Sequence, residues 1–128
     1  MGQGIALAFS SLNGMPEVTA TEAKQIIERG SQLIDVRTDV EYAAGHIPGA
    51  RHIPLSDVQR ESGALDKDQP VVIYCRSGNR SAPAADAFAA SGWDAHSIEG
   101  GLLGWAEAGM ELEPDSGAVL DNPNMPPR

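Results

Sequence analysis

The chain has 128 residues, with 18 acidic residues against 9 lysines and arginines, which gives a formal net charge of −9 at pH 7. This length suits one domain, and a hydrophobic share of 41% with 21% charged residues is ordinary for a soluble globular domain. The acidic balance argues against nucleic acid or an anionic membrane surface as the main partner, and no apolar stretch approaches the roughly 20 residues that a membrane-spanning helix needs.

The first 16 residues are predicted to be a lead-in segment that precedes the folded domain. Residues 5–9, Ile-Ala-Leu-Ala-Phe, form a short apolar patch within it. No basic segment precedes this patch and no long apolar run follows, so a signal peptide is not expected. We expect the segment to be frayed or docked on the surface of the domain.

Residues 17–110 are predicted to form a single α/β domain. Thr19 and Glu22 have the spacing of a capping box, which predicts a helix that runs to Arg29 and ends at Gly30. The further predicted elements, in chain order, are a strand over 32–36, a helical turn over 39–42, a Gly/Pro-shaped loop over 45–50, a strand over 51–53, a helix that starts near 56, a buried strand over 71–74, a helix from about 80–82 to Gly92, a strand over 93–98 and a short helix over 102–108. Strands that alternate with helices imply a mainly parallel sheet covered on both faces.

Chemically capable side chains follow two of these strands. Cys75 comes directly after the strand over 71–74, while Asp35 and Arg37 lie at the end of the strand over 32–36. Ligands of open parallel sheets bind beyond the carboxyl ends of the strands. We therefore expect these three residues to lie near one another at one edge of the sheet.

Cys75 is the only cysteine of the chain, so it cannot form a disulfide within the molecule. It lies at a strand-to-helix turn, where backbone N–H groups are available to hold an anion. Arg76 and Arg80 flank it, and no acidic residue occurs between residues 69 and 85. These surroundings predict a pKa below the value of about 8.5 that is usual for a cysteine. A thiol that only fills space in the core, the commoner role of a single cysteine, requires none of these neighbours.

The loop after Cys75 is suited to a cradle of inward-facing N–H groups. Gly78 is able to adopt a positive φ and let the loop curl back on itself. Three small or turn-forming polar residues complete the loop: Ser77, Asn79 and Ser81. One of the last two is expected to cap the following helix. Pro83 is tolerated only in the first turn of a helix, which places the helix start at about residues 80–82.

The cysteine and histidine content also bears on cellular setting and metal binding. A single cysteine without an export signal predicts a reducing, cytoplasmic location. The three histidines, His46, His52 and His96, do not have the spacing of metal ligands together with Cys75. No zinc site is therefore expected.

Residues 111–128 are predicted to be an acidic, proline-rich tail. This stretch contains four acidic residues, one arginine and four prolines. Its apolar content is too small for a core, so we expect an extended or partly disordered segment. The alternative is that Val119, Leu120 and Met125 dock on the domain or on a second subunit.

Four short motifs together resemble the rhodanese family of sulfurtransferases. In chain order they are Asp35-Val36-Arg37 followed by Glu41-Tyr42; Gly45-His46-Ile47-Pro48-Gly49-Ala50 followed by Ile53-Pro54; the loop from Tyr74 to Ser81; and Gly100-Gly101 followed by Trp105. Each string alone is a weak signal, but their order and spacing over residues 17–110 are specific. One departure is His52, which stands where asparagine is frequent in the family.

The resemblance implies a five-stranded, mainly parallel sheet with helices on both faces. It also implies that Cys75 takes a sulfane sulfur from a small anionic donor such as thiosulfate and holds it as a persulfide. Backbone N–H groups from Arg76 to Arg80 would stabilise the anionic terminal sulfur, and the two arginine side chains would attract the donor or orient the loop. The acceptor would be cyanide in an assay, or a thiol or a protein in the cell, and no metal or organic cofactor is required.

Five further residues of these motifs are assigned supporting roles: Asp35, Arg37, Glu41, Gly100 and Gly101. We expect Arg37 and Glu41 to form an ion pair that pins the first turn of a helix, with direct substrate contact as the alternative. Asp35 is expected to hydrogen-bond loop backbone near the site, and the two glycines to allow close backbone approach beside the cysteine loop. The remaining candidates, His46, Trp93 and Trp105, are expected to be structural.

Two other functions remain open. Cysteine phosphatases and arsenate reductases use a related cradle with five residues between cysteine and arginine, whereas four separate Cys75 from Arg80 here. Tyr74 also stands where the phosphatase motif has histidine. The third reading is a non-catalytic module that carries sulfur to a partner protein or senses it for that partner. The oligomeric state is left open.

Overall fold

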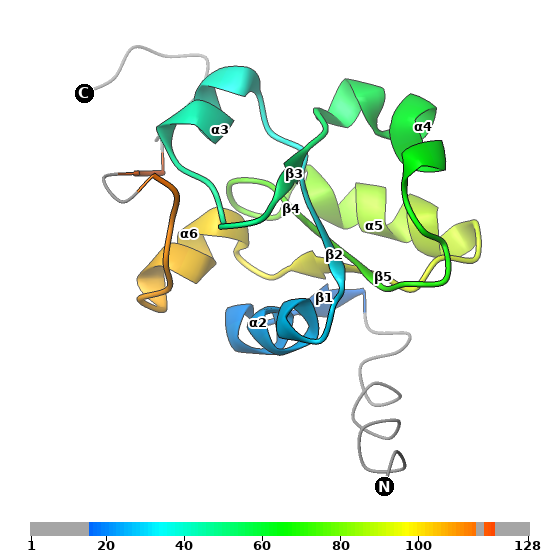
Figure 1. Ribbon diagram of the computed structural model, residues 1–128, viewed down its shortest axis with the longest axis horizontal. Helices are drawn as coiled ribbons and strands as arrows, with labels where there is room; N and C mark the ends of the chain where they lie inside the picture. Colours follow the sequence, from blue (N-terminus) through cyan, green and yellow to red (C-terminus); the bar gives the residue numbers. More distant parts are fainter. Residues whose placement is uncertain (1–15, 115–116, 120–128) are drawn as a thin grey trace, which may run out of the picture.

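The computed structural model describes residues 16–114 and 117–119, so the predicted apolar patch over 5–9, Leu120 and Met125 lie outside the described residues. Its elements, shown in Figure 1, are β1 (Glu17–Val18), α2 (Ala20–Glu28), β2 (Gln32–Asp35), α3 (Asp39–Ala44), β3 (Arg51–His52), the 3₁₀ turn η1 (Leu55–Asp57), α4 (Val58–Glu61), η2 (Ser62–Ala64), β4 (Val71–Tyr74), α5 (Ser81–Ala90), β5 (Ala95–Ile98) and α6 (Gly101–Glu107). None of the described helices is both long enough and apolar enough to cross a membrane.

The five strands form one sheet in the order β1-β5-β4-β2-β3, and the described strand pairs are all parallel. This confirms the predicted α/β architecture with a five-stranded sheet. The central strand β4 places Tyr74 opposite Asp35 of β2 and Ile73 opposite Ser97 of β5. The carboxyl ends of β2 and β4 therefore lie side by side.

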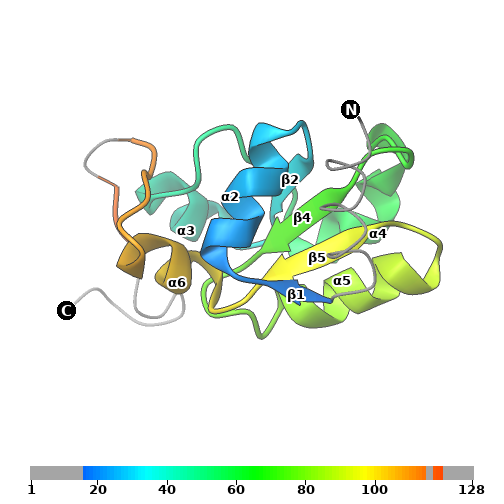
Figure 2. The same cartoon turned by 90° about the horizontal axis from the view of Figure 1, so that it is seen from below.

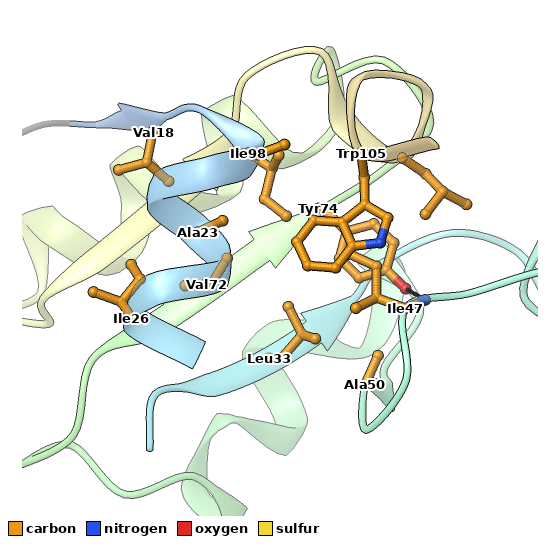
Figure 3. Close-up of a cluster of buried hydrophobic side chains, with 12 residues drawn as sticks. Val18, Ala23, Ile26, Leu33, Ile47, Ala50, Val72, Tyr74, Ile98 and Trp105 are labelled. Atoms are coloured by element: carbon orange, nitrogen blue, oxygen red, sulfur yellow. Dashed lines mark hydrogen bonds between the residues drawn. The ribbon is translucent and has the colours of Figure 1, made fainter. Parts of the chain in front are cut away.

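Two apolar clusters pack on opposite faces of the sheet. Helices α2 and α6 cover one face, and α4 and α5 cover the other (Figures 1 and 2). Side chains alternate along β4, as they must in a strand. Val72 and Tyr74 belong to the cluster under α2 and α6, which Figure 3 shows in close-up. Val71, Ile73 and Cys75 belong to the cluster under α5, so the thiol faces that helix.

Helices α2 and α3 begin at capping boxes, whereas α5 begins without a side-chain cap. Thr19 and Glu22 form the predicted capping box at α2, and Thr38 and Glu41 form a second one at α3. Helix α5 begins at Ser81, within the predicted range. The predicted cap by Asn79 or Ser81 is wrong, because Arg80 is the N-cap and makes no capping bond with its side chain. The Ser81 hydroxyl instead donates to the Cys75 sulfur.

The chain beyond α6 lies against the domain where the structure describes it. His46 and Glu113 exchange two backbone hydrogen bonds of 2.9 and 2.7 Å, and the Ala118 amide donates to the Ala44 carbonyl at 2.8 Å. Val119 packs against the cluster under α2 and α6. The predicted extended segment therefore lies against the domain at 111–114 and 117–119, and the docked alternative holds for Val119. Paired backbone groups and a covered apolar side chain stabilise this placement.

Candidate functional site

Cys75 sits at the point where the central strand gives way to helix α5. The strand β4 is fully buried, and the cysteine that follows it is 1% exposed. The loop over 75–80 then turns back on itself, and it is visible in Figure 1 between β4 and α5. The turn at Gly78 has a φ of +103°, a conformation that favours glycine. The thiol is thus held at the bottom of a short loop rather than projecting into solvent.

Four donors converge on the sulfur of Cys75. The backbone N–H groups of Gly78, Arg80 and Ser81 lie 3.0, 3.3 and 3.4 Å from Sγ. The Ser81 hydroxyl donates from 3.5 Å. Ser77 and Asn79 are exposed on the outside of this loop, and Arg76 is half-buried. The arrangement is a cradle for an anionic sulfur, built mainly from backbone.

These donors shift the titration of the thiol. Burial by itself would raise the pKa of Cys75, since it disfavours the thiolate. The hydrogen bonds from the side chain and amide of Ser81, and from the amides of Arg80 and Gly78, outweigh burial and lower the pKa below its ordinary value. The direction agrees with the sequence-based expectation. The physical cause is hydrogen bonding more than the charge of the flanking arginines.

The Arg80 guanidinium pairs with Glu41 and also interacts electrostatically with Cys75. It makes two hydrogen bonds to the Glu41 carboxylate, Nη1 to Oε1 at 2.8 Å and Nη2 to Oε2 at 2.9 Å. Glu41 is fully buried, and its Oε1 also accepts from the amide of Thr38 at 3.0 Å in the capping box of α3. The carboxylate thereby joins α3 to the cysteine loop across 38 intervening residues of sequence.

The predicted ion pair between Arg37 and Glu41 is wrong. Arg37 pairs instead with Asp35, with Nε–Oδ1 at 2.9 Å and Nη2–Oδ2 at 2.6 Å, and its Nη2 also donates to the Gly45 carbonyl at 2.6 Å. The reason is local: Arg37 precedes the N-cap Thr38 and so turns back toward the strand end. Glu41, in the third position of the helix, faces its own N-terminus and the loop beyond it.

Asp35 and Arg37 lie at the same sheet edge as Cys75 but do not make up its cradle. Asp35 accepts from the Arg37 amide at 2.9 Å, so it hydrogen-bonds the backbone that follows β2 and not the cysteine loop. The Arg37 guanidinium lies 5.6 Å from the ring centre of Tyr74. The Tyr74 hydroxyl in turn accepts from the Ile47 amide at 3.0 Å (Figure 3). Asp35, Arg37 and Tyr74 thus stabilise the backbone next to the cysteine loop.

The two glycines before α6 bring a second backbone segment against the cysteine loop. The Leu102 amide donates to the Cys75 carbonyl at 2.8 Å, and the Leu103 amide donates to the Arg76 carbonyl at 3.0 Å. A Cβ atom on Gly101 would lie 2.5 Å from the Cys75 carbonyl oxygen. The close approach predicted for this pair therefore holds at Gly101, where only glycine fits.

One contact to the cradle was not predicted. The hydroxyls of Ser81 and Ser97 lie 2.7 Å apart, and both residues are fully buried. Ser97 belongs to no recognised motif and stands in the middle of β5. Alternation along that strand could have placed it on the same face as Ala95. Its meeting with Ser81 depends on how α5 crosses the sheet.

His46 packs against Tyr42, in keeping with the structural role expected for it. Its Nδ1 lies 2.8 Å from the Tyr42 carbonyl, and its ring stacks on the Tyr42 ring with centres 3.8 Å apart. The described residues contain no group of three or more His, Cys, Asp or Glu side chains that could hold a metal ion.

Comparisons with known proteins agree with this geometry. A family model described as a rhodanese-like domain matches residues 19–108. The thiosulfate sulfurtransferase GlpE of Pseudomonas paraeruginosa is 39% identical over 89 residues, which cover 69% of this chain and 81% of that protein. The HTH-type transcriptional regulator Rv0324 of Mycobacterium tuberculosis is 35% identical over 122 residues, covering 91% of this chain and 53% of the regulator. The crystal structure of a rhodanese-related protein from Thermoplasma volcanium superposes with a TM-score of 0.70 at 28% identity, covering 75% of this chain and 95% of that one. The chain belongs to the rhodanese family.

Proposed function

We propose that the protein is a sulfurtransferase that carries a sulfane sulfur as a persulfide on Cys75. The observation that carries the proposal is the buried thiol with four hydrogen-bond donors aimed at its sulfur. The relative named thiosulfate sulfurtransferase supports the same reaction class and favours thiosulfate as donor. With one cysteine in the chain, a reducing and cytoplasmic setting stays our prediction for its location.

The reaction has two displacement steps. The Cys75 thiolate attacks the outer sulfur of thiosulfate, the sulfur–sulfur bond of the donor breaks, and sulfite leaves with the electron pair. The protein then holds a Cys75 persulfide whose terminal sulfur is anionic. A thiolate or cyanide attacks that terminal sulfur, the persulfide bond breaks, and Cys75 leaves as thiolate. No oxidant, metal or organic cofactor enters this balance.

The cradle favours both steps because it holds a negative sulfur without reorganising. Backbone N–H groups that already point at Sγ stabilise the thiolate as attacking group and again as leaving group. Arg80 orients the loop through Glu41, so its charge is largely balanced before a donor arrives. Arg76, Ser77 and Asn79 lie on the outer part of the loop, where we expect the anionic donor to approach.

Loop size argues against phosphoryl chemistry. Four residues separate Cys75 from Arg80, and Arg80 is already held by both carboxylate oxygens of Glu41. A tetrahedral phosphate needs a wider cradle and an arginine whose guanidinium is able to bind it in a bidentate manner. We therefore expect negligible hydrolysis of p-nitrophenyl phosphate under conditions that give sulfur transfer.

The experiment that tests the proposal is mass spectrometry of the intact protein after incubation with thiosulfate. The expected result is a mass increase of one sulfur atom, which cyanide removes as thiocyanate. Cys75→Ser is expected to gain no sulfur, and it controls for sulfur bound elsewhere. An unchanged mass in the wild-type protein would contradict the proposal.

A second candidate is a module that carries or senses sulfur for a partner protein. A transcriptional regulator shares similarity with 91% of this chain, which supports this reading. Such a module would load sulfur on Cys75 normally but pass it to cyanide or small thiols only slowly. Single-turnover transfer from loaded protein separates the two: fast discharge to small acceptors favours the enzyme, and discharge only after adding a partner favours the carrier.

A further inference from the structure

The buried hydroxyl of Ser97 is linked to the reacting sulfur through the hydroxyl of Ser81. Ser97 stands in β5 opposite Ile73 of β4, two residues before Cys75. Its side chain lies on the same face of the sheet as Ala95, which packs in the cluster that contains Cys75. The Ser97 hydroxyl meets the Ser81 hydroxyl at 2.7 Å, and the latter reaches Sγ at 3.5 Å.

Counting protons sets the direction of this chain of hydrogen bonds. A serine hydroxyl has one proton to donate, and a thiolate has none. If Ser81 donates its proton to Sγ, the proton between the two hydroxyls must come from Ser97. In the opposite order Ser81 would donate to Ser97 and would offer the sulfur no proton.

We propose that Ser97 is a positioning residue that, by donating to Ser81, aims the Ser81 hydroxyl at the Cys75 sulfur. The inference rests on the proposed role of Cys75 as nucleophile. A hydroxyl that receives a hydrogen bond is polarised and donates more strongly, so Ser97 stabilises the thiolate although it does not contact it. The hydroxyl of Ser81 heads the hydrogen bonds that lower the pKa of Cys75, against the opposing effect of burial.

The charged groups near the thiol are not part of the hydrogen-bond chain from Ser97 through Ser81 to Cys75. Arg76 and Arg80 lie in the cysteine loop, and Glu41 of α3 pairs with Arg80. His96 of β5 faces the opposite side of the sheet from Ser97, and its Nε2 lies 2.8 Å from an oxygen of Asp94. Glu99, beyond the end of β5, is exposed. Asp86 of α5 and Glu107 of α6 are also exposed. Removal of the Ser97 hydroxyl leaves these groups in place.

The test is the titration of Cys75 by its thiolate absorbance in the ultraviolet. The chain has a single cysteine, and both of its tyrosines have pKa values raised by burial, so the signal belongs to Cys75. Ser97→Ala should raise the midpoint by about half a pH unit, and Ser81→Ala by about one unit. In the Ser81→Ala background, Ser97→Ala should cause no further shift. Alanine already stands at position 95 on this face of β5, so the substitution suits the strand.

Ser62→Ala is the matched control, because its hydroxyl donates to the Gln59 carbonyl, outside the cysteine loop. No shift in Ser97→Ala, or an equal shift with and without Ser81, would overturn the proposal. The rate of thiosulfate consumption gives a second measurement. Below the midpoint of the Cys75 titration, Ser97→Ala should be about threefold slower than wild type, and above that midpoint the two rates should be equal. A loss that is equal at every pH would mean a merely structural role. The titration needs no sulfur transfer, so its failure is distinct from failure of the proposed function.

Discussion

Two ion pairs, one fully buried and one partly buried, lie at the same edge of the sheet and stabilise different parts of the molecule. Asp35 and Arg37 are two residues apart and fully buried; Asp35 accepts from the backbone after β2, and Arg37 donates to the Gly45 carbonyl at the end of α3. Glu41 and Arg80 are 39 residues apart, and the arginine side chain is 32% exposed. The first pair stabilises the segment from the end of β2 to the end of α3, whereas the second joins α3 to the cysteine loop. Proximity to Cys75 alone therefore does not tell which charges act on the site.

Removal of Arg37 should have the largest effect on stability. Arg37→Ala leaves the Asp35 carboxylate buried without its partner and breaks the bond to the Gly45 carbonyl. We expect a loss of about 3–5 kcal/mol in the free energy of unfolding, measured by urea denaturation. The thiolate titration of the molecules that remain folded should stay close to wild type. A large change in that titration with little loss of stability would reverse the roles assigned to the two pairs.

Removal of Arg80 should cost less stability but more activity. Arg80→Ala leaves Glu41 buried and releases the loop from α3, but part of the arginine is solvated, so we expect about 1–3 kcal/mol. Sulfur transfer from thiosulfate should fall roughly tenfold or more, because the N–H donors lose their fixed position. The ratio of wild-type to variant rate should be similar at low and high salt, since Glu41 already balances the charge. A ratio that shrinks strongly with salt would instead indicate steering of the donor.

The second pair also predicts how stability depends on pH. Burial by itself would raise the pKa of Glu41, but the bonds from Arg80 and Thr38 outweigh it and lower the pKa below the ordinary value of 4.5. A carboxylate with a lowered pKa stabilises the fold above its ordinary pKa, and this contribution is lost as the pH falls through the folded value. Glu41→Gln keeps the capping geometry and should lose less stability than wild type on acidification below 4.5. Equal acid sensitivity of the two proteins would contradict the assignment.

The smallest effect is expected at an ion pair outside this edge. Arg60 and Asp57 lie 2.9 Å apart at the surface, with the arginine side chain 71% exposed. Arg60→Ala should change the free energy of unfolding by about 0.5 kcal/mol or less and leave the transfer rate unchanged. Urea denaturation and the thiosulfate assay check both values. A loss comparable to that of Arg80→Ala would mean that burial does not explain the ranking.

Local patterns predicted much of the fold because their causes are local. The capping box of Thr19 and Glu22 involves neighbours in the chain, and Pro83 restricts a helix start without help from elsewhere. The apolar run over 71–74 is a strand with those bounds in the structure. The four-residue spacing of Arg37 and Glu41 led to a wrong prediction of an ion pair. This spacing brings two side chains together only when both residues lie in one helix, and Arg37 precedes α3.

The order of apolar runs, turns and motifs along the chain was enough to predict a parallel α/β sheet, a strand-to-helix turn at Cys75 and the family. Three contacts required the folded chain to be seen: Glu41 binds Arg80, the Ser97 hydroxyl lies against that of Ser81, and Val119 packs on the domain. Turns and caps depend on a few neighbouring residues, so a single sequence carries their signal. Contacts between distant segments depend on strand register and on how helices cross the sheet, and the whole core sets both.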